Sequence, residues 1–589
     1  DLPKGRWDPL ENFVSEVSYV QPMDTFLQHW WLPPVQPDVI ETFTSQLSIS
    51  QPVATTLANR RLRSVREALA YLHPTLDHLH DPLTLPDMDT AVHRVLRAVD
   101  GREQIVVYGH DDVDGITSTL VLLQAIRSLK GNVHSYIPDR VTEGTGLSWG
   151  GLNLLAQGGA KLVVTVDCGL QDQQVIENSH RLSTDVIVVD HHEVGGTIPR
   201  GVPFVNPKRS DCSYLFRDLA GVGVSFKLAQ ALVLSKGKPL HRFFDSVGDL
   251  VALGTLADKT PLVNENRVLT KLGLDLMRSR PRPGLAAVLA LFNEPQSIHQ
   301  EFLMSKAIPI LSSANSIQGQ SVSLDLLQTE DREQAAQLAR ELLAASHQWQ
   351  QAFKESYQRI SEKVKGEHAG EDGAILVIDD PTPPRVLGTC ASKLMREHHR
   401  PAVVLSFSDD RYFGEARGPK GCNLVDLLGL CRDLLITFGG HKQAAGFSLF
   451  PEHIDRFRER LTELSKTMSV AGHSPHRLDS ELDISSLDQT LLRELDMLAP
   501  FGRENPNPLF LSRDVTIVPT VAERIEETHT CIGTVNGFPV VASQRLMDDW
   551  RKKGDRPSVH CDIIYQISRS NGDAPQIVLR DVRCAEASC

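Results

Sequence analysis

Aspartate and histidine side chains follow four apolar segments in the first half of the chain. Asp112 and Asp114 lie just after QIVVYGH, Asp167 follows KLVVTV, the triplet at 190–192 follows DVIVV, and Asp258 ends LVALGTLA. Taken singly, each cluster could equally be a polar loop, a capping aspartate or a pair of surface histidines. Together they supply several carboxylates and one or two imidazoles, as a pair of divalent cations requires. The chemistry implied is in-line hydrolysis of a phosphoester.

The residue types also indicate which cations would bind. Imidazole suits manganese, iron or zinc better than magnesium, whereas carboxylate oxygens suit magnesium and manganese. Carboxylates two residues apart in an extended segment point the same way. We therefore expect Asp112 and Asp114 to face one site while Val113 faces the sheet, and we expect Asp190 to orient a neighbouring imidazole by hydrogen bonding.

The elements that must position these residues alternate between strand and helix from about residue 103 to 260. QIVVYGH, KLVVTVD and DVIVVDH are short apolar, β-branched runs, typical of buried parallel strands, and ITSTLVLLQAIRSLKG is helical. This alternation predicts an α/β fold with a doubly wound parallel sheet. Ligands of such sheets bind at the carboxyl ends of the strands, where the acids and histidines stand.

The remaining chain shows further changes of pattern. Apolar positions spaced by threes and fours over 335–364 predict one long amphipathic helix. GAILVI and AVVLSF indicate a second α/β region, and short β-type runs such as FPVVAS and PQIVLRDV indicate a terminal β-barrel. We expect five regions: an N-terminal extension (1–95), a catalytic domain (96–265), a helical region with the long connecting helix (266–370), a smaller α/β domain (371–470) and the barrel (476–589).

Bulk properties narrow the class of protein. A chain of 589 residues is too long for one hydrophobic core. It has no apolar run of the roughly 18 to 20 residues that cross a bilayer, and its first residues lack a secretion-signal pattern, so we expect a cytoplasmic protein. Nine scattered cysteines without a C-x-x-C pair indicate reduced thiols. The net charge of -13 opposes coating of nucleic acid, but cations bound to carboxylates invert the local field.

The four clusters, in this order and spacing, resemble the motifs of the DHH phosphoesterase superfamily. VNPKRSDCSYLFRDLAGVGVSFKLAQAL, LGTLADKTPLVNENR, FGGHKQAAG and APFGRENPNPLF resemble the RecJ family, and the resemblance covers nearly the whole chain from about residue 50. It implies a DHH domain, a DHH-associated domain and an OB-fold. It also implies 5'-to-3' hydrolysis of single-stranded DNA to 5'-mononucleotides, in DNA recombination and repair.

The resemblance assigns roles residue by residue. It implies that two manganese or magnesium ions bind Asp112, Asp114, Asp167, His191 and Asp258, together with His110 where the family usually has aspartate. His192, beside Asp190, would stabilise charge at the scissile phosphate. Substrate binding would fall to Arg140, near the 5' end of the strand, and to Arg417, Gly439, Gly440 and His441, with the glycines in a loop that the substrate approaches closely.

Several positions depart from the family pattern. Thr145 replaces a usual tyrosine, Ile310 stands at the place of an arginine, and Glu415 occupies a position normally held by a small hydroxyl residue. A carboxylate there would repel a 5'-phosphate. We therefore expect an intact metal site and a weaker grip on the DNA end.

Two alternatives belong to other functional classes. A phosphodiesterase of the same superfamily could act on short oligonucleotides or cyclic dinucleotides, but such relatives are shorter and lack the barrel. A RecJ-like, non-catalytic replication or repair scaffold would have lost metal ligands that this chain keeps. The expected partner is single-stranded DNA, with a single-strand-binding protein and a helicase as further expectations, no membrane, and a monomeric state.

Overall fold

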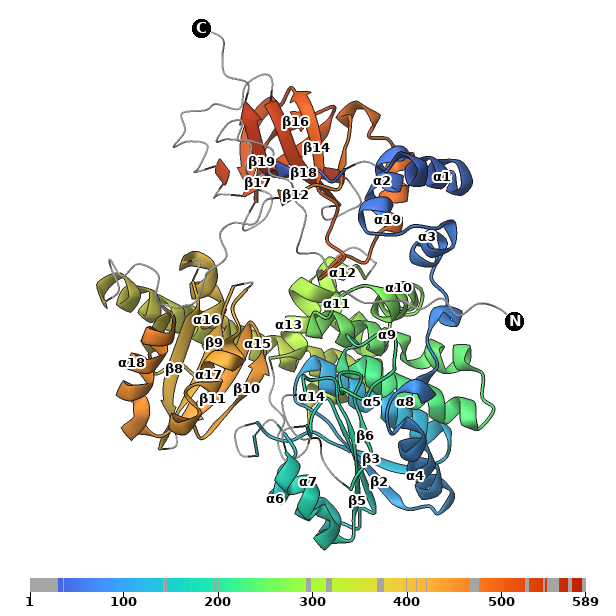
Figure 1. The fold of residues 1–589 in the computed structure, drawn as a ribbon, viewed down its shortest axis with the longest axis vertical. Coiled ribbons are helices and arrows are strands. Elements are labelled where there is room, and N and C mark those ends of the chain that lie inside the picture. The colour runs from blue at the N-terminus through green and yellow to red at the C-terminus, as the bar shows by residue number, and fades with distance from the viewer. Residues whose placement is uncertain are drawn as a thin grey trace.

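The structure, a computed structural model, shows three lobes that meet at the centre of the molecule (Figure 1). Among the described residues, no helix has both the length and the apolar character needed to span a bilayer. The description runs from residue 30 to 584 and leaves out 35, 141–142, 145, 171, 195–197, 199–200, 293–297, 314–319, 368–374, 399, 409, 420, 466–475, 525–528, 544–545, 548–560 and 570–574.

The first lobe is built on a five-stranded, wholly parallel sheet in the order β3-β2-β4-β5-β6. The predicted α/β fold with a parallel sheet is therefore confirmed. Continuous apolar runs form the three central strands because helices cover both faces of the sheet. The strands are β2 (Gln104–Tyr108), β3 (Asn132–Tyr136), β4 (Leu162–Val166), β5 (Asp185–Val189) and β6 (Phe204–Val205).

Two apolar cores lie on the two faces of this sheet. Helices α5 and α8 are apolar on almost every side, as buried helices are, and they pack on each other and on α9. The helices are α4 (Met88–Asp100), α5 (Val113–Ser128), α6 (Trp149–Gln157), α7 (Gln173–Asn178), α8 (Gly221–Ser235), α9 (Leu240–Asp258) and α10 (Asn264–Ser279), with short η2 (Pro82–Thr84) and η3 (Ser179–Leu182).

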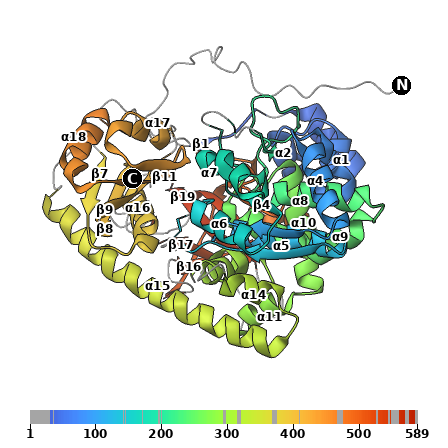
Figure 2. The same cartoon turned by 90° about the horizontal axis from the view of Figure 1, so that it is seen from below.

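A helical region extends this lobe and leads to the second one. The helix expected over 335–364 is α15, Arg332–Glu367, which runs along the outside of the molecule to the second lobe (Figure 2). Ile310 is 2% exposed in the apolar core of this region. The shorter elements are α11 (Pro283–Ala290), α12 (Gln300–Phe302), η4 (Leu303–Ala307), α13 (Ile308–Leu311) and α14 (Val322–Gln328).

The second lobe is a mixed sheet in the order β10-β11-β9-β8-β7. The glycines expected in a loop, Gly439 and Gly440, instead lie in strand β10, because FGGH pairs with β11 in a hairpin. Gly440 has φ +134, and the Ala444 carbonyl occupies the place of a Cβ, so the hairpin itself requires glycine there. The elements are β7 (Leu376–Asp379), α16 (Pro384–His398), β8 (Ala402–Ser408), β9 (Arg411–Arg417), α17 (Leu424–Gly429), η5 (Arg432–Leu434), β10 (Thr437–His441), β11 (Ala444–Leu449), η6 (Pro451–His453) and α18 (Ile454–Ser465).

The third lobe is a seven-stranded sheet in the order β13-β14-β18-β19-β17-β16-β15, with β1 (Trp30–Trp31) paired to β12 (His476–Arg477) beside it. Its strands are β13 (Ser480–Glu481), β14 (Phe510–Val515), β15 (Val518–Arg524), β16 (His529–Val535), β17 (Phe538–Ser543), β18 (Cys561–Arg569) and β19 (Pro575–Cys584). Short η7 (Ile484–Ser486) and α19 (Gln489–Met497) follow β13.

The N-terminal region divides its packing between two lobes. One apolar core joins α1 (Pro37–Leu47), α2 (Gln51–Asn59) and α3 (Val65–Leu72) to α19 and the third lobe. Helix α4 packs instead on the parallel sheet of the first lobe. Residues 73–87, which include η1 (Leu76–His78), therefore lead from one lobe to the other.

Candidate metal centre

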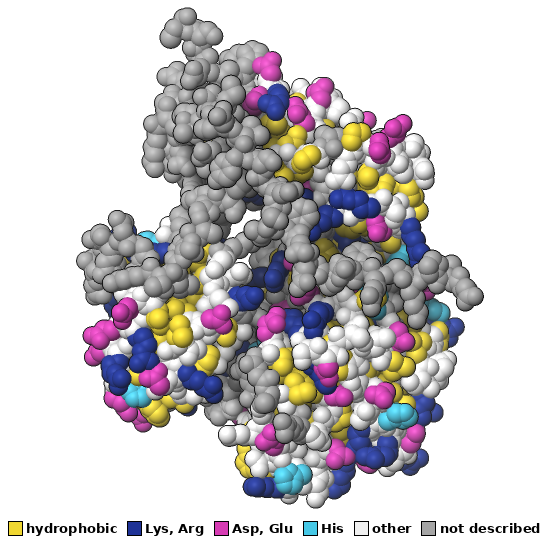
Figure 3. Space-filling model, viewed as in Figure 1, with side chains coloured by type: hydrophobic (Ala, Val, Ile, Leu, Met, Phe, Trp, Pro, Cys, Tyr) yellow, Lys and Arg dark blue, Asp and Glu magenta, His cyan; other side chains and the backbone are white. Residues whose placement is uncertain are grey.

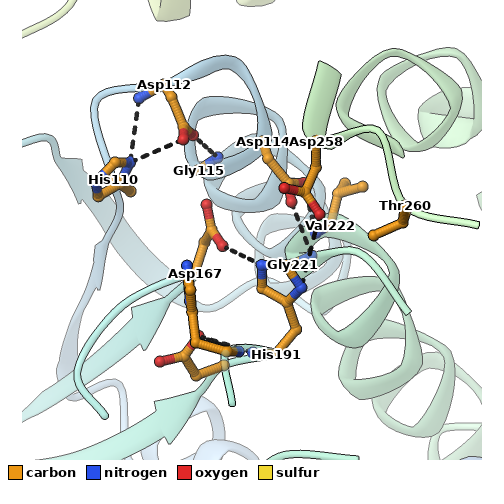
Figure 4. Close-up of polar contacts among 12 residues, drawn as sticks. His110, Asp112, Asp114, Gly115, Asp167, His191, Gly221, Val222, Asp258 and Thr260 are labelled. Carbon is orange, nitrogen blue, oxygen red and sulfur yellow. Dashed lines mark hydrogen bonds and ion pairs between the residues drawn. The ribbon is translucent and has the colours of Figure 1, made fainter. Parts of the chain in front are cut away.

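The acidic and histidine residues converge at the carboxyl edge of the parallel sheet (Figure 4). Ligand atoms within 4.8 Å of one another define two sets that have no member in common: His110, Asp112 and Asp167, and Asp114, His191 and Asp258. A third set, Asp167, His191 and His192, overlaps both. Two sets connected in this way match the ligand arrangement of a two-cation centre with shared ligands.

The start of α5 separates Asp112 from Asp114. Asp112 is the N-cap, and its Oδ1 accepts a hydrogen bond from Gly115 N at 2.9 Å. Asp114 lies in the first helical turn, so the expectation that the two carboxylates share an extended segment and one direction was wrong. The helical turn directs Asp112 toward His110 and Asp114 toward Asp258, so each belongs to a different set.

Helix α8 holds Asp114 with its own N-terminus. The buried carboxylate accepts hydrogen bonds from Gly221 N and Val222 N, both at 2.8 Å (Figure 4). Backbone amides at a helix start favour an anion through unsatisfied donors and the helix dipole. A Cβ on Gly221 would lie 2.5 Å from Asp167 Oδ1, so only glycine allows this approach.

Asp167 follows β4 in a left-handed conformation with φ +60, which is uncommon for a residue other than glycine. Its Oδ1 is buried without a hydrogen bond from any described residue, and His191 Nε2 lies 3.1 Å away. A buried carboxylate oxygen without a donor is costly unless a cation satisfies it. The site therefore fits a divalent cation with carboxylate and imidazole ligands.

The two histidines that follow β5 have different roles. Asp190 accepts hydrogen bonds from His191 N at 2.7 Å and Leu170 N at 3.2 Å, and its Oδ1 lies 2.7 Å from His192 Nδ1. Asp190 thus orients the ring of His192. The ring of His191 is placed by Leu219 O, 3.2 Å from its Nδ1, and lies in the metal set with Asp258.

Burial and mutual repulsion raise the pKa of the carboxylates in the centre of the cluster. Burial raises the pKa of Asp114 and Asp167 well above the usual range, and neighbouring carboxylates raise both further. Burial, together with Asp112, raises the pKa of Asp258 to about 7. Carboxylates that resist ionisation in this way are those that gain most from a nearby cation.

The histidine of the DHH triplet has the opposite electrostatic character. Burial lowers the pKa of His192, but the Asp190 carboxylate outweighs burial and raises that pKa to about 9. The same contact, added to that of His191, holds the pKa of Asp190 below its usual range despite burial. At neutral pH His192 therefore carries a positive charge beside the carboxylate cluster.

Arg140 borders the set that contains His110. Its Nε donates to Asp111 Oδ2 at 2.9 Å and its Nη2 to Asp111 Oδ1 at 2.9 Å. His110 Nδ1 lies 3.2 Å from Asp112 Oδ2. Burial lowers the pKa of His110, but Asp112 and Asp111 outweigh this effect and raise it. Sequence reasoning did not identify Asp111 as the partner of Arg140, although it stands beside Asp112 in the same motif.

The predicted substrate-binding residues of the second lobe lie apart from the metal ligands. Arg417 Nη1 forms an ion pair with Glu415 Oε2 at 2.7 Å, both on β9. Burial lowers the pKa of the Arg140 guanidinium, but nearby carboxylates, Asp111 first among them, outweigh burial and raise it. Glu415 of the second lobe is one of these carboxylates, so the two lobes interact electrostatically here. His441 belongs to β10, but its side chain lies outside the described set, as does Thr145.

Models of three protein families match the chain. They are the DHH family N-terminal domain at residues 104–255, the DHHA1 domain at 370–467 and the RecJ OB domain at 478–569. The first match contains β2 to β6 and most of α9, the second the sheet of the second lobe, and the third most of the seven-stranded sheet. The third lobe is therefore an OB domain, as expected.

Curated relatives match most of the chain. The single-stranded-DNA-specific exonuclease RecJ of Bacillus subtilis is 31% identical over 538 residues, which are 90% of this chain and 67% of that protein. The RecJ of Escherichia coli is 30% identical over 482 residues, with 77% of this chain and 82% of that protein aligned.

A solved structure shares the arrangement of the lobes. The crystal structure of Thermus thermophilus RecJ in complex with Mn2+ aligns with 95% of this chain and 80% of its own length, with a TM-score of 0.77 and 25% identity. The family models, the relatives and this structure agree across the three lobes. The chain belongs to the RecJ family.

Proposed function

We propose that this chain is a metal-dependent exonuclease specific for single-stranded DNA, which degrades strands in the 5'-to-3' direction and releases 5'-mononucleotides. The observation that carries the proposal is the pair of adjacent ligand sets at the carboxyl edge of the sheet. Such a centre suits phosphodiester hydrolysis, and the RecJ relatives support single-stranded DNA as the substrate. DNA recombination and repair are the processes that require such an activity.

The metal ligands we propose are His110, Asp112, Asp114, Asp167, His191 and Asp258. Bound manganese or magnesium ions supply the Lewis acidity that lets water attack a phosphodiester at neutral pH. The chain's own contribution is to fix the donors: α8 holds Asp114, the left-handed turn after β4 presents Asp167, and Leu219 O sets the ring of His191.

His192 and Asp190 form the proposed catalytic pair that is not defined by metal binding. Asp190 fixes Nδ1 of His192, so Nε2 is the nitrogen that donates to an oxygen of the scissile phosphate. The positive charge of His192 stabilises negative charge that develops on that phosphate. A neutral ring held the same way would lose most of this electrostatic effect.

We assign binding of the DNA strand mainly to the second and third lobes. Arg140, Arg417, Gly439, Gly440 and His441 are the proposed substrate-binding residues, and Lys and Arg side chains gather around the hollow where the lobes meet (Figure 3). The OB barrel binds single strands by base stacking and backbone contacts. Within this assignment Glu415, paired with Arg417, weakens binding of a 5'-phosphate.

We assign domains as an extension (1–95), the catalytic domain (96–265), the helical connection (266–370), the DHH-associated domain (371–470) and the OB barrel (476–589). We further propose that the chain works as a monomer in the cytoplasm, where chromosomal DNA lies, beside a single-strand-binding protein and a helicase.

The test uses the purified chain with Mn2+ and a single strand labelled at either end. A 5' label should appear at once as mononucleotide, whereas a 3' label should pass through a ladder of shortening products. Duplex DNA of the same sequence and the double variant Asp190→Ala, His191→Ala are the controls. Release from neither label, or release that the double variant retains, would refute the proposal.

A further inference from the structure

Residues 499–506, which lead from α19 into the barrel, lie on the lobe that contains the metal ligands. The segment follows α19 down onto α10 and α12 (Figure 1). Leu262 N donates to Arg503 O at 2.8 Å, only four residues beyond the metal ligand Asp258. A Cβ on Gly502 would lie 2.7 Å from Leu262 Cδ1, so the backbone is as close here as glycine allows.

The segment is fixed on both sides of Arg503. Phe501 exchanges two hydrogen bonds with the side-chain amide of Gln300. Arg267, on α10, donates to Leu498 O at 2.9 Å. The buried Asn505 donates from Nδ2 to Pro500 O at 2.6 Å. A backbone held by this many contacts presents its exposed side chain in a defined place.

The Arg503 side chain is exposed, and it forms no hydrogen bond or ion pair within the part of the chain that the structure describes. Its backbone is bonded to Leu262, four residues beyond Asp258, and its charge, like that of Lys208, is among those that oppose the rise in the pKa of Asp258. The two cations differ in one respect: Lys208 Nζ is already paired with Glu193 Oε1 at 3.3 Å. Arg503 is thus a cation next to a phosphoesterase centre with its donors uncommitted.

Arg503 and Arg140 stand on different sides of the centre. Arg140 is paired with Asp111, between the ligands His110 and Asp112 of one set, whereas Arg503 is bonded to Leu262, four residues beyond Asp258 of the other set. A strand that crosses both sets would pass one arginine before the scissile bond and the other after it. A guanidinium binds phosphate through two parallel hydrogen bonds, which suits it to this position.

We propose that Arg503 binds a backbone phosphate of the retained strand, on the 3' side of the scissile bond. The inference rests on the proposed function, because it takes a single strand as the ligand and places its 5' end at Arg140. It adds a contact that belongs to neither the metal centre nor the sheet of the barrel. Through this contact, the segment that connects the barrel to the catalytic lobe helps to hold the strand between successive cleavages.

The first test measures the salt dependence of binding. The probe is a 5'-fluorescent single strand with phosphorothioate linkages, which resist hydrolysis, in the presence of Mn2+. Arg503→Gln should weaken binding and reduce the slope of log Kd against log salt by about 0.7, the contribution of one phosphate contact on a single strand. The matched control is Arg278→Gln, whose guanidinium pairs with Asp275 on the outer side of α10, and its slope should equal that of the wild type.

The second test locates the contact. Single phosphates of the strand are replaced in turn by uncharged methylphosphonates. Replacement of one particular phosphate on the 3' side of the scissile bond should weaken binding by the wild type severalfold. The same replacement should leave binding by Arg503→Gln unchanged, because the arginine that contacts this phosphate is already absent. If the replacement weakens binding by both proteins equally at every position, the phosphate contact does not exist.

Failure of the inference and failure of the proposed function give different results. If the wild type does not degrade the unmodified strand, the proposed function is wrong. If it does, and Arg503→Gln matches it in salt slope and in the methylphosphonate series, only the role of Arg503 is wrong. A loss of Mn2+ affinity in Arg503→Gln with an unchanged salt slope would likewise overturn the phosphate contact, since Arg503 would then act on the cations instead.

Discussion

The carboxylate cluster predicts how stability and metal affinity depend on pH. Burial and Asp112 raise the pKa of Asp258 from its ordinary value of 3.8 to about 7 in the folded, metal-free protein. Between these values the folded state keeps a proton that the unfolded state has lost, so stability falls as pH rises through this window. At about 1.4 kcal/mol per pH unit well inside this window, Asp258 alone lowers the free energy of unfolding by about 3 kcal/mol between pH 4 and pH 7.

Cations reverse this dependence because they bind the deprotonated carboxylate. Below pH 7 the cation that binds Asp258 must displace its proton, so the apparent Kd for Mn2+ at that site should rise about tenfold for each pH unit below 7. Asp114 and Asp167 have raised pKa values from the same causes and add to the effect in the same direction. The stabilisation that Mn2+ provides should therefore be small at pH 5.5 and large at pH 8.

The assay is thermal unfolding from pH 5 to pH 8.5, once with a chelator and once with excess Mn2+. The matched variant is Asp258→Asn, which keeps the shape of the side chain but cannot ionise. With chelator, the Tm of the wild type should fall relative to the variant as pH rises through 7, and this difference cancels effects common to both proteins. A wild-type Tm that rises relative to the variant over this range would refute the reasoning.

Three other substitutions test separate parts of the structure. Gly221→Ala, whose Cβ meets Asp167, should cost about 1–3 kcal/mol and weaken Mn2+ binding in calorimetry; unchanged Mn2+ affinity would contradict the close approach. Lys227→Met leaves the wholly buried Glu265 without its ion-pair partner, so urea unfolding should show a loss of about 3–5 kcal/mol, whereas a loss under 1 kcal/mol would argue against the pair. Glu415→Ser should raise kcat/KM severalfold on 5'-phosphorylated strands and leave it unchanged on 5'-hydroxyl strands; equal change on both would remove Glu415 from end recognition.

The sequence predicts those strands of the catalytic sheet that are buried along their whole length. β2, β4 and β5 lie inside the sheet, so every position selects an apolar residue and the run is visible. β3 is an edge strand in which only Val133 and Tyr136 of NVHSY are buried, and β6 has only two residues. Neither leaves a continuous apolar run, so sequence reasoning found only the central strands.

The site could be predicted as a set of strand and helix ends, but not as two separate sets of ligands. Asp112 and Asp114 fall on opposite sides because α5 begins between them, and the start of a helix shifts by one residue with little change in local sequence preference. The amide of Gly221 that binds Asp114 comes from a helix about 100 residues further along. The Arg503 carbonyl accepts a hydrogen bond from Leu262 N, four residues beyond Asp258, and no local sequence pattern encodes this docking of the segment before the barrel.

The metal-free site is therefore stabilised unevenly. Asp114 already has two backbone donors at the start of α8, so the fold itself compensates that carboxylate. Asp167 Oδ1 has no hydrogen bond from the described residues, and burial raises the pKa of Asp258 although the charges of His192, Lys208 and Arg503 oppose the rise. Cation binding must consequently compensate Asp167 and Asp258 more than it compensates Asp114. Because the segment that carries Arg503 is bonded to Leu262, four residues beyond Asp258, the proposed phosphate contact and the ligand set of Asp258 depend on the same contact between the catalytic lobe and the segment before the barrel.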